Sequence, residues 1–382
     1  MAKQTKQKKK GNLLPLLIGL GVGAIGGFIL SSLVNWAFGD LSTPLYICAF
    51  LGEALIITVA LIFGIIAHEA GHLVFGLVTG YKFSSFRIFS LMWLKNPDEK
   101  IKLKRFKLAG TGGQCLMSPP DMKDGKIPTT IYNLGGVFAN LIFGAIFLIL
   151  FFVFFNIRIL AIAMMIFCII NILFSMTNGI PMSSGGIDND AKNTISTRKN
   201  PKAMQAFWIQ MKINEETSNG VRLKDMPKEW FALPSDEEMQ NSIISAIAVF
   251  SANRLVDEKN FEEADALMTE IIDGNNATIS FYKQMLTCDR IYVELIGECR
   301  STVIDNMLDN NQKAIMKAMK NYPAVIRTEY AYELLLKKDT EKANKILETF
   351  EKIAKKYPYE SEIQGERELI EIAAKKSQEK NQ

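Results

Sequence analysis

The segment that decides the fold is residues 55–80, LIITVALIFGIIAHEAGHLVFGLVTG. It is long enough to cross a bilayer as one helix, because about 20 apolar residues at a rise of about 1.5 Å span the hydrocarbon core. Three ionisable side chains, His68, Glu69 and His72, lie inside it. Such side chains are costly within a membrane unless a partner or a metal holds them. The segment therefore predicts a functional site within a membrane-spanning helix.

Long apolar stretches surround this segment. Residues 41–67 carry a single charge, and residues 13–39, 127–157 and 159–187 carry none. Each is long enough to span a bilayer. No such stretch follows Ile187 in the chain of 382 residues. The sequence thus predicts four transmembrane helices followed by a soluble part.

Basic residues concentrate beside these stretches. Residues 1–200 hold 19 Lys and Arg against 9 Asp and Glu, whereas the remainder holds 25 against 31. Five lysines precede the first stretch, and ten Lys or Arg lie between Lys82 and Lys126. By the positive-inside rule both groups are cytoplasmic. We therefore expect a multi-pass protein of the cell membrane with both termini in the cytoplasm, an uncleaved first anchor, and contact with lipid but not with nucleic acid.

The connection after residue 80 has a different character. FSSFRIFSLMW (83–93) and IKLKRFKL (101–108) are rich in β-branched and aromatic residues and are joined by Asn96-Pro97-Asp98. This pattern predicts a β-hairpin over residues 81–108. Residues 109–130 are rich in Gly, Pro and Asp and are expected to form a loop.

From about Pro201 the pattern becomes a series of amphipathic helices separated by polar breaks. Residues 251–272 and 330–350 look alike, each with an apolar-faced helix, a short polar turn and a second helix. They are similar to tetratricopeptide-type helical pairs. An irregular helical bundle is the alternative. In either form, the acidic balance of this part suits contact with a cytoplasmic protein partner.

The chemistry of the site starts from its histidines. His68 and His72 are the only histidines in the chain, and positions i and i+4 share one helix face, so both imidazoles can reach one metal ion. Glu69 can then act on a water molecule as general base. The alternative is a packed or exposed histidine pair at a helix end.

A catalytic zinc usually has a third protein ligand. With no other histidine, this ligand must be a carboxylate or a cysteine. The five cysteines show no CxxC pairing. The segment NGIPMSSGGIDND (178–190) supplies Asp188 and Asp190 on the same side of the membrane as the histidines. One Zn²⁺ per chain is therefore expected.

Three motifs together resemble the site-2 protease family of intramembrane zinc metalloproteases. They are HEAGH (68–72), GGVFAN (135–140) and Asn178-Gly-Ile-Pro181 followed by aspartates. The resemblance covers roughly residues 45–195. It implies that His68, His72 and an aspartate hold zinc, that Glu69 is catalytic, and that Asn140 helps to hold the substrate or the oxyanion. A helix–helix hydrogen bond is the alternative role for Asn140.

The third motif departs from the family pattern. Its spacer is longer, and no Asp-Gly follows Pro181. Asp190 is favoured as the ligand over Asp188, because Gly185 and Gly186 can absorb the extra residues in a tight turn. The unused aspartate is then expected to cap the following helix.

The resulting prediction is an all-α polytopic membrane protein with four transmembrane helices, a short membrane-associated β-hairpin and a C-terminal soluble helical, tetratricopeptide-like domain. Its expected domains are residues 1–44 (basic N-terminus and first transmembrane helix), 45–200 (intramembrane metalloprotease core) and 201–382 (cytoplasmic helical domain).

The expected function is that of a zinc metalloendopeptidase acting on membrane-anchored proteins or peptides. The hairpin would hold an extended substrate by strand addition. Alternatively, Phe86, Phe89 and Trp93 would anchor it at the membrane surface. An inactive membrane scaffold that binds a partner through its helical tail is the alternative function.

Overall fold

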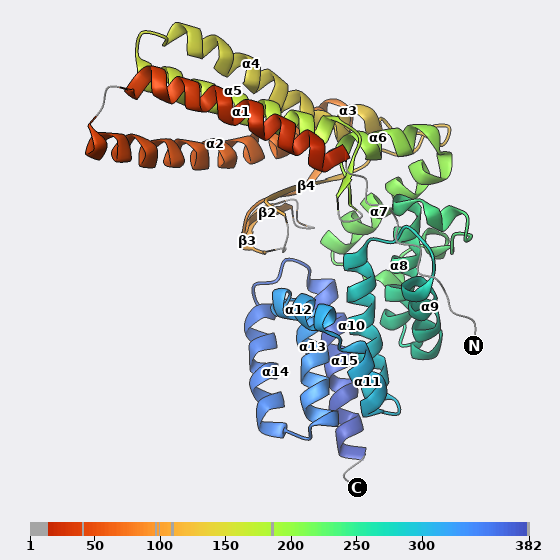
Figure 1. Cartoon of the computed structure of the whole chain (residues 1–382). Helices are drawn as coiled ribbons and strands as arrows, with labels where there is room; N and C mark the ends of the chain where they lie inside the picture. Colours follow the sequence, from red (N-terminus) through yellow and green to blue (C-terminus); the bar gives the residue numbers. More distant parts are fainter. Residues whose placement is uncertain are drawn as a thin grey trace, which may run out of the picture. The chain divides into compact units, whose positions relative to one another are not determined.

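The computed structural model describes residues 14–39, 42–95, 98, 100–107, 111–184 and 187–379 (Figure 1). The N-terminal lysines and the turns predicted at Asn96-Pro97 and at Gly185-Gly186 lie outside these residues. Contacts divide the chain into two compact units. The first comprises Met1–Gly71, Gly136–Ser184 and Asp188–Lys192, and the second comprises His72–Gly135, Gly185–Ile187 and Asn193–Gln382.

The first unit is a bundle of apolar helices. It contains α1 (Leu14–Phe38), most of α2 (Thr43–Val78), α4 (Gly135–Val153) and α5 (Arg158–Gly179). Among the described residues, three helical segments are long and apolar enough to cross a membrane: Ile47–Val78, Gly135–Val153 and Arg158–Gly179. Three of the four predicted spans are therefore candidate membrane helices by length and composition. The first span is an apolar helix, but its crossing of the membrane, and thus the count of four, stays a prediction.

Small residues allow close packing within this bundle. A Cβ atom on Gly64 of α2 would lie 2.8 Å from the Phe174 ring of α5, and one on Gly144 of α4 would lie 2.8 Å from the Ile172 side chain. Close backbone approach at glycine is how helices associate in lipid, where the hydrophobic effect does not drive them together. These contacts fix how α5 lies against α2 and α4.

The connection after α2 forms a four-stranded antiparallel sheet in the order β3-β2-β1-β4. Its strands are β1 (Lys82–Ile88), β2 (Leu91–Lys95), β3 (Ile101–Arg105) and β4 (Gly113–Ser118). The predicted antiparallel pairing of the strands on either side of Asn96-Pro97-Asp98 is present, as β2 with β3. However, the hairpin prediction was too small and the loop prediction for 109–130 was wrong, because β4 pairs with the free side of β1. Its neighbouring Gly and Pro residues conceal this short strand in the sequence.

The rest of the second unit is helical. Its first helices are α3 (Thr129–Asn133), α6 (Asp190–Lys199), which begins in the first unit, and α7 (Pro201–Ser218). A two-stranded sheet of β5 (Ser183–Ser184) and β6 (Ile187–Asp188) precedes α6. The remaining helices are η1 (Leu223–Asp225), η2 (Lys228–Phe231), η3 (Glu238–Gln240), α8 (Ser242–Asp257), α9 (Phe261–Asp273), α10 (Ser280–Ile296), α11 (Ser301–Met307), α12 (Asn310–Ala318), α13 (Pro323–Ala331), η4 (Tyr332–Leu336), α14 (Thr340–Ala354) and α15 (Glu360–Glu379).

The two similar sequence stretches are helical pairs in the structure. The first stretch runs through α8 and α9, and the second runs from α13 through η4 to α14. Both pairs contribute to one apolar core that includes Ala252, Ala264, Ala331, Ala343 and Phe350. The four alanines have no exposed surface, and such small side chains leave room for a neighbouring helix. Membership in the tetratricopeptide class stays a prediction.

Candidate metal centre

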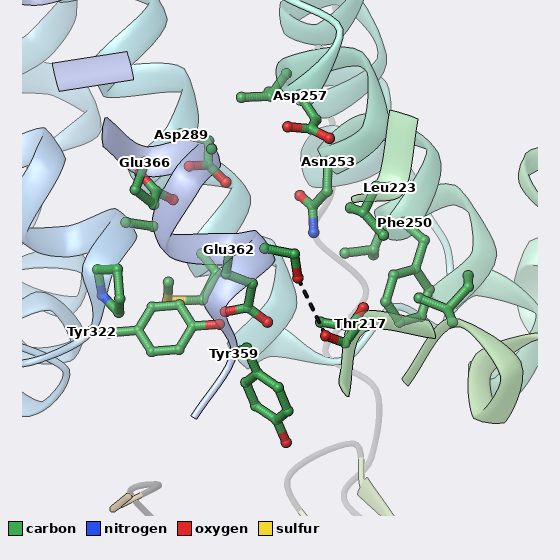
Figure 2. A pocket seen from close by; sticks show the side chains of 18 of the residues that line it. Thr217, Leu223, Phe250, Asn253, Asp257, Asp289, Tyr322, Tyr359, Glu362 and Glu366 are labelled. Carbon is green, nitrogen blue, oxygen red and sulfur yellow. Dashed lines mark hydrogen bonds between the residues drawn. The ribbon is translucent and has the colours of Figure 1, made fainter. Parts of the chain in front are cut away.

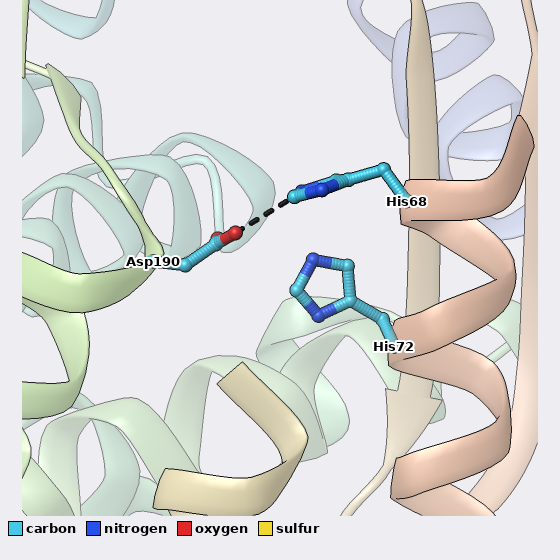
Figure 3. A group of neighbouring side chains, drawn as sticks. All are labelled: His68, His72 and Asp190. Carbon is cyan, nitrogen blue, oxygen red and sulfur yellow. Dashed lines mark ion pairs between the residues drawn. The ribbon is translucent and has the colours of Figure 1, made fainter. Parts of the chain in front are cut away.

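The two histidines lie one turn apart on α2. This helix runs without interruption from Thr43 to Val78, with Pro44 in the first turn, where proline is tolerated. His68 is buried and His72 is half-buried. Figure 3 shows both imidazoles projecting from the same side of the helix.

The partner of His72 determines which ring nitrogen can bind a metal. Its Nδ1 lies 2.9 Å from the backbone oxygen of Tyr132 in α3. A carbonyl oxygen only accepts hydrogen bonds, so Nδ1 must carry the proton and donate. In the neutral imidazole of His72, the lone pair is therefore on Nε2. A backbone carbonyl behind an imidazole is a common arrangement for a metal-binding histidine.

The sheet holds Tyr132 in place. The Tyr132 ring stacks on Tyr81, which directly precedes β1, with ring centroids 4.5 Å apart. The Tyr132 hydroxyl donates to the backbone oxygen of Cys115 in β4 at 3.3 Å. Thus β4, which the sequence analysis missed, helps to position the carbonyl that orients His72.

An amide orients His68 in the same way. Its Nδ1 lies 2.9 Å from Oδ1 of Asn140 in α4. The Asn140 amide is oriented by Gly64, whose backbone oxygen accepts from Nδ2 at 3.1 Å. Because Nδ2 must face that carbonyl, Oδ1 faces the histidine, and His68 Nδ1 donates. In the neutral imidazole of His68, the lone pair is therefore also on Nε2.

A second asparagine continues this network. Asn140 Nδ2 also donates to Oδ1 of Asn171 in α5 at 2.9 Å, and Asn171 Nδ2 donates to the backbone oxygen of Phe167 at 2.8 Å. Both asparagines are fully buried. The sequence analysis missed Asn171, although an amide in an uncharged membrane span is itself a signal of a polar role. The contacts of Asn140 give it an orienting role, and its predicted contact with the substrate stays a prediction.

Gly136 leaves room for the His68 ring. A Cβ atom at this position of α4 would lie 2.5–2.7 Å from three atoms of the imidazole. That distance is shorter than any ordinary contact between nonbonded atoms, so a larger residue would displace the ring. The GGVFAN segment therefore contacts His68 twice, through Gly136 and through Asn140.

The structure brings Asp190, the first residue of α6, to the histidines. Its Oδ2 lies 3.1 Å from His68 Nε2, and one ligand atom from each of His68, His72 and Asp190 lies within 4.8 Å of the others (Figure 3). Asp188 has different contacts. Its Oδ1 accepts from Ser183 Oγ at 2.5 Å and pairs with Lys192 Nζ at 2.8 Å.

Asn189, which lies between Asp188 and Asp190 in the sequence, holds the start of α6 in place. Its Oδ1 accepts from the backbone nitrogen of Lys192 in the first turn of α6 at 3.1 Å, which is the geometry of a helix N-cap. Its Nδ2 donates to the backbone oxygens of Thr177 and Ile180 at 2.8 and 2.6 Å. The capping role predicted for the unused aspartate therefore belongs to Asn189. These bonds tie the start of α6 to the end of α5.

Comparison with known proteins identifies the family. The family model described as peptidase family M50 matches residues 56–377. The chain belongs to peptidase family M50. This confirms the resemblance to site-2 proteases. No curated protein and no solved structure matched the chain.

The donor set suits the metal that M50 peptidases use. Two imidazoles and one carboxylate are a common ligand set for catalytic zinc and leave a fourth position open. Ligand atoms around tetrahedral zinc are about 3.3 Å apart, given bonds of about 2.0 Å. Zinc binding would therefore draw the ligand atoms of His68, His72 and Asp190 together by up to about 1.5 Å. In the neutral form of both histidines, Nδ1 donates to its partner and the lone pair that could bind a metal is on Nε2.

Proposed function

We propose that the protein is an intramembrane zinc metalloendopeptidase that cleaves membrane-anchored proteins or peptides. The observation that carries the proposal is the convergence of His68, His72 and Asp190 to within 4.8 Å from α2 and α6. Family membership supports a metalloprotease. The three apolar helices support a membrane location for the site.

Each residue has a separate chemical role. His68, His72 and Asp190 would hold zinc. Bound zinc would act as a Lewis acid and lower the pKa of a coordinated water. Glu69 lies on α2 beside His68 and is half-buried. It would take a proton from the attacking water and pass a proton to the leaving amine. Asn140 and the Tyr132 carbonyl would keep the imidazoles in the reactive tautomer.

The substrate must present an extended backbone, because helical carbonyls are engaged in hydrogen bonds and are sterically covered. We propose that the β1–β4 sheet holds such a segment by strand addition. β3 is an edge of this sheet, and its residues Ile101 and Leu103 are about 60% exposed.

We also propose that both termini lie in the cytoplasm and that the C-terminal helices recruit a partner protein there.

The test compares two glutamates of α2. Glu69→Gln should retain about one zinc per chain but abolish processing, which would appear as precursors accumulating in the membrane proteome of cells carrying the variant. Glu53→Gln is the matched control, since Glu53 lies about 24 Å from Glu69 along the same helix by helical rise. A wild-type protein that purifies without zinc, or normal processing by Glu69→Gln, would refute the proposal.

A further inference from the structure

The second unit contains a cavity that none of the candidate zinc ligands lines. Its volume is about 390 Å³, and its walls come from β4 and from α7, α8, α10, α13 and α15. Figure 2 shows lining side chains from α8, α10 and α15. Sites for small ligands typically measure about 300–1,000 Å³. The cavity is therefore large enough for one or two amino-acid side chains.

Aromatic rings form one wall. Tyr357 packs edge-on against Tyr322, Tyr359 and Phe106, with ring centroids 6.3, 6.1 and 5.6 Å apart. All four residues line the cavity. Aromatic faces attract organic cations through the negative charge of their π-systems. This wall suits an alkylammonium or guanidinium group.

The charges that line the cavity leave one carboxylate without a cation. Arg222 pairs with Asp257, and Arg327 pairs with Asp289 and Glu366. Glu362 has no Lys, Arg or His partner among the described residues, and its Oε2 accepts from the Tyr357 hydroxyl at 2.8 Å. Figure 2 shows its carboxylate beside Tyr322.

The pKa values of Glu362 and Tyr322 agree with a buried carboxylate that lacks a cationic partner. Burial raises the pKa of Glu362 to about 7. The charge of Glu362, together with burial, raises the pKa of the Tyr322 hydroxyl well above its ordinary value. A bound cation beside Glu362 would favour its ionised form.

A second group in the cavity lacks a hydrogen-bond acceptor. Arg327 is about 99% buried, and its Nη1 has no hydrogen-bond partner among the described residues. The side-chain amides of Gln114 and Asn253 also line the cavity. A simple amine offers only donors, whereas a peptide brings carbonyl oxygens together with a cationic side chain. The lining therefore suits a peptide better than a free amine.

We infer that this cavity binds a lysine or arginine side chain presented by a segment of a partner protein, with Glu362 as the counter-charge and the tyrosines around the aliphatic stem. This binding site is independent of peptide hydrolysis. It provides a specific means by which the C-terminal helices could recruit a partner.

The test uses N-acetyl-lysine N-methylamide as a probe, titrated calorimetrically into the full-length protein in detergent. Its neutral control is the norleucine analogue, which has the same stem without the ammonium group. The lysine probe should bind with a Kd in the millimolar range. The norleucine analogue should bind at least about tenfold more weakly, because a charge-assisted hydrogen bond is lost. Butylammonium, which lacks carbonyl groups, should also bind more weakly than the lysine probe.

The variant Glu362→Gln should weaken binding of the lysine probe about tenfold, whereas Glu360→Gln, an exposed position on the same helix, should leave it unchanged. Equal binding of the lysine and norleucine probes would overturn the inference without any variant. Failure of the lysine probe to bind the wild type, or unchanged binding by Glu362→Gln, would overturn it as well. Equal binding of butylammonium would refute the peptide as the ligand and identify a free amine instead.

Discussion

Two buried polar networks in this protein are built in different ways. In the apolar bundle, His68, Asn140 and Asn171 form a network of neutral groups that ends on the backbone oxygens of Gly64 and Phe167. In the C-terminal helices, Arg327 is buried with two carboxylates, Asp289 and Glu366.

The difference between these networks follows from their surroundings. A neutral amide can be satisfied entirely by carbonyls and other amides, so it enters lipid-facing helices at low cost. A buried guanidinium requires counter-charges, and the ion pair then depends on every member. Loss of one member of the neutral network should therefore lower zinc affinity only moderately. Loss of one member of the charged network should destabilise the fold, because the remaining charges stay buried without a partner.

The largest effect is expected from Arg327→Met. The variant leaves Asp289 and Glu366 buried without their cation, and breaking a buried pair in this way typically costs about 3–5 kcal/mol of unfolding free energy. The measurement is urea unfolding of the full-length protein in detergent. Arg367→Met removes a half-exposed pair with Glu351 and should cost less than about 1 kcal/mol.

The pH dependence of Arg327→Met provides a further check. Burial raises the pKa of Asp289 and of Glu366 in the folded wild type, and removal of the arginine raises both further. Because the folded variant then binds protons more tightly than its unfolded state, its stability relative to the wild type should rise as the pH falls through these folded pKa values. A pH-independent difference would contradict the ion-pair account.

The second largest effect is expected from Asp190→Asn, measured as zinc affinity. This variant removes the negative charge of the proposed third ligand, and the loss should exceed the roughly 10–100-fold that outer partners of a metal site contribute. Asp188→Asn is the control, since Asp188 contacts Ser183 and Lys192. If Asp188→Asn lost more zinc than Asp190→Asn, the assignment of the third ligand would be wrong.

Gly136→Ala should disturb the neutral network by steric displacement. The added methyl group would contact the His68 ring at about 2.5 Å and push the imidazole away from Asp190. Zinc affinity should fall about 10–100-fold, as for other changes to groups that orient a ligand. Gly52→Ala on α2 adds a methyl group where no atom lies within 4 Å, and it should retain zinc. Normal zinc binding by Gly136→Ala would show that His68 is not held where the structure has it.

The smallest of these effects is expected from Asn171→Leu. The variant removes one acceptor of Asn140 Nδ2 and leaves the bonds to His68 and Gly64 in place. Zinc affinity should fall by about tenfold, the lower end of the range for outer partners. Thr58→Val, which removes a hydroxyl bonded only within its own helix, is the control. A loss as large as that of Asp190→Asn would mean that the network fails as a unit, which would remove its contrast with the Arg327 network.

Different parts of the fold followed from the sequence to different degrees. The helix through HEAGH and the helical pairs of the C-terminal part were predicted, because apolar periodicity is a local property of the chain. The strand β4 was missed, since a six-residue strand among Gly and Pro residues is stabilised only by its partner β1. Pairing between distant segments leaves little signal in the composition of either one.

The candidate metal centre likewise has features that the sequence determines and features that depend on the tertiary structure. The sequence by itself determined that His68 and His72 share one face of α2, because the helical repeat fixes the relation between positions i and i+4. Only the tertiary structure decided that Asp190, and not Asp188, lies beside them, and that Asn140 and Asn171 lie behind His68. Those relations depend on the rotation and depth of separate helices, which are set by the packing of glycines against Phe174, Ile172 and His68 and by the bonds of Asn189. Such long-range contacts are a property of the assembled bundle and of no single segment.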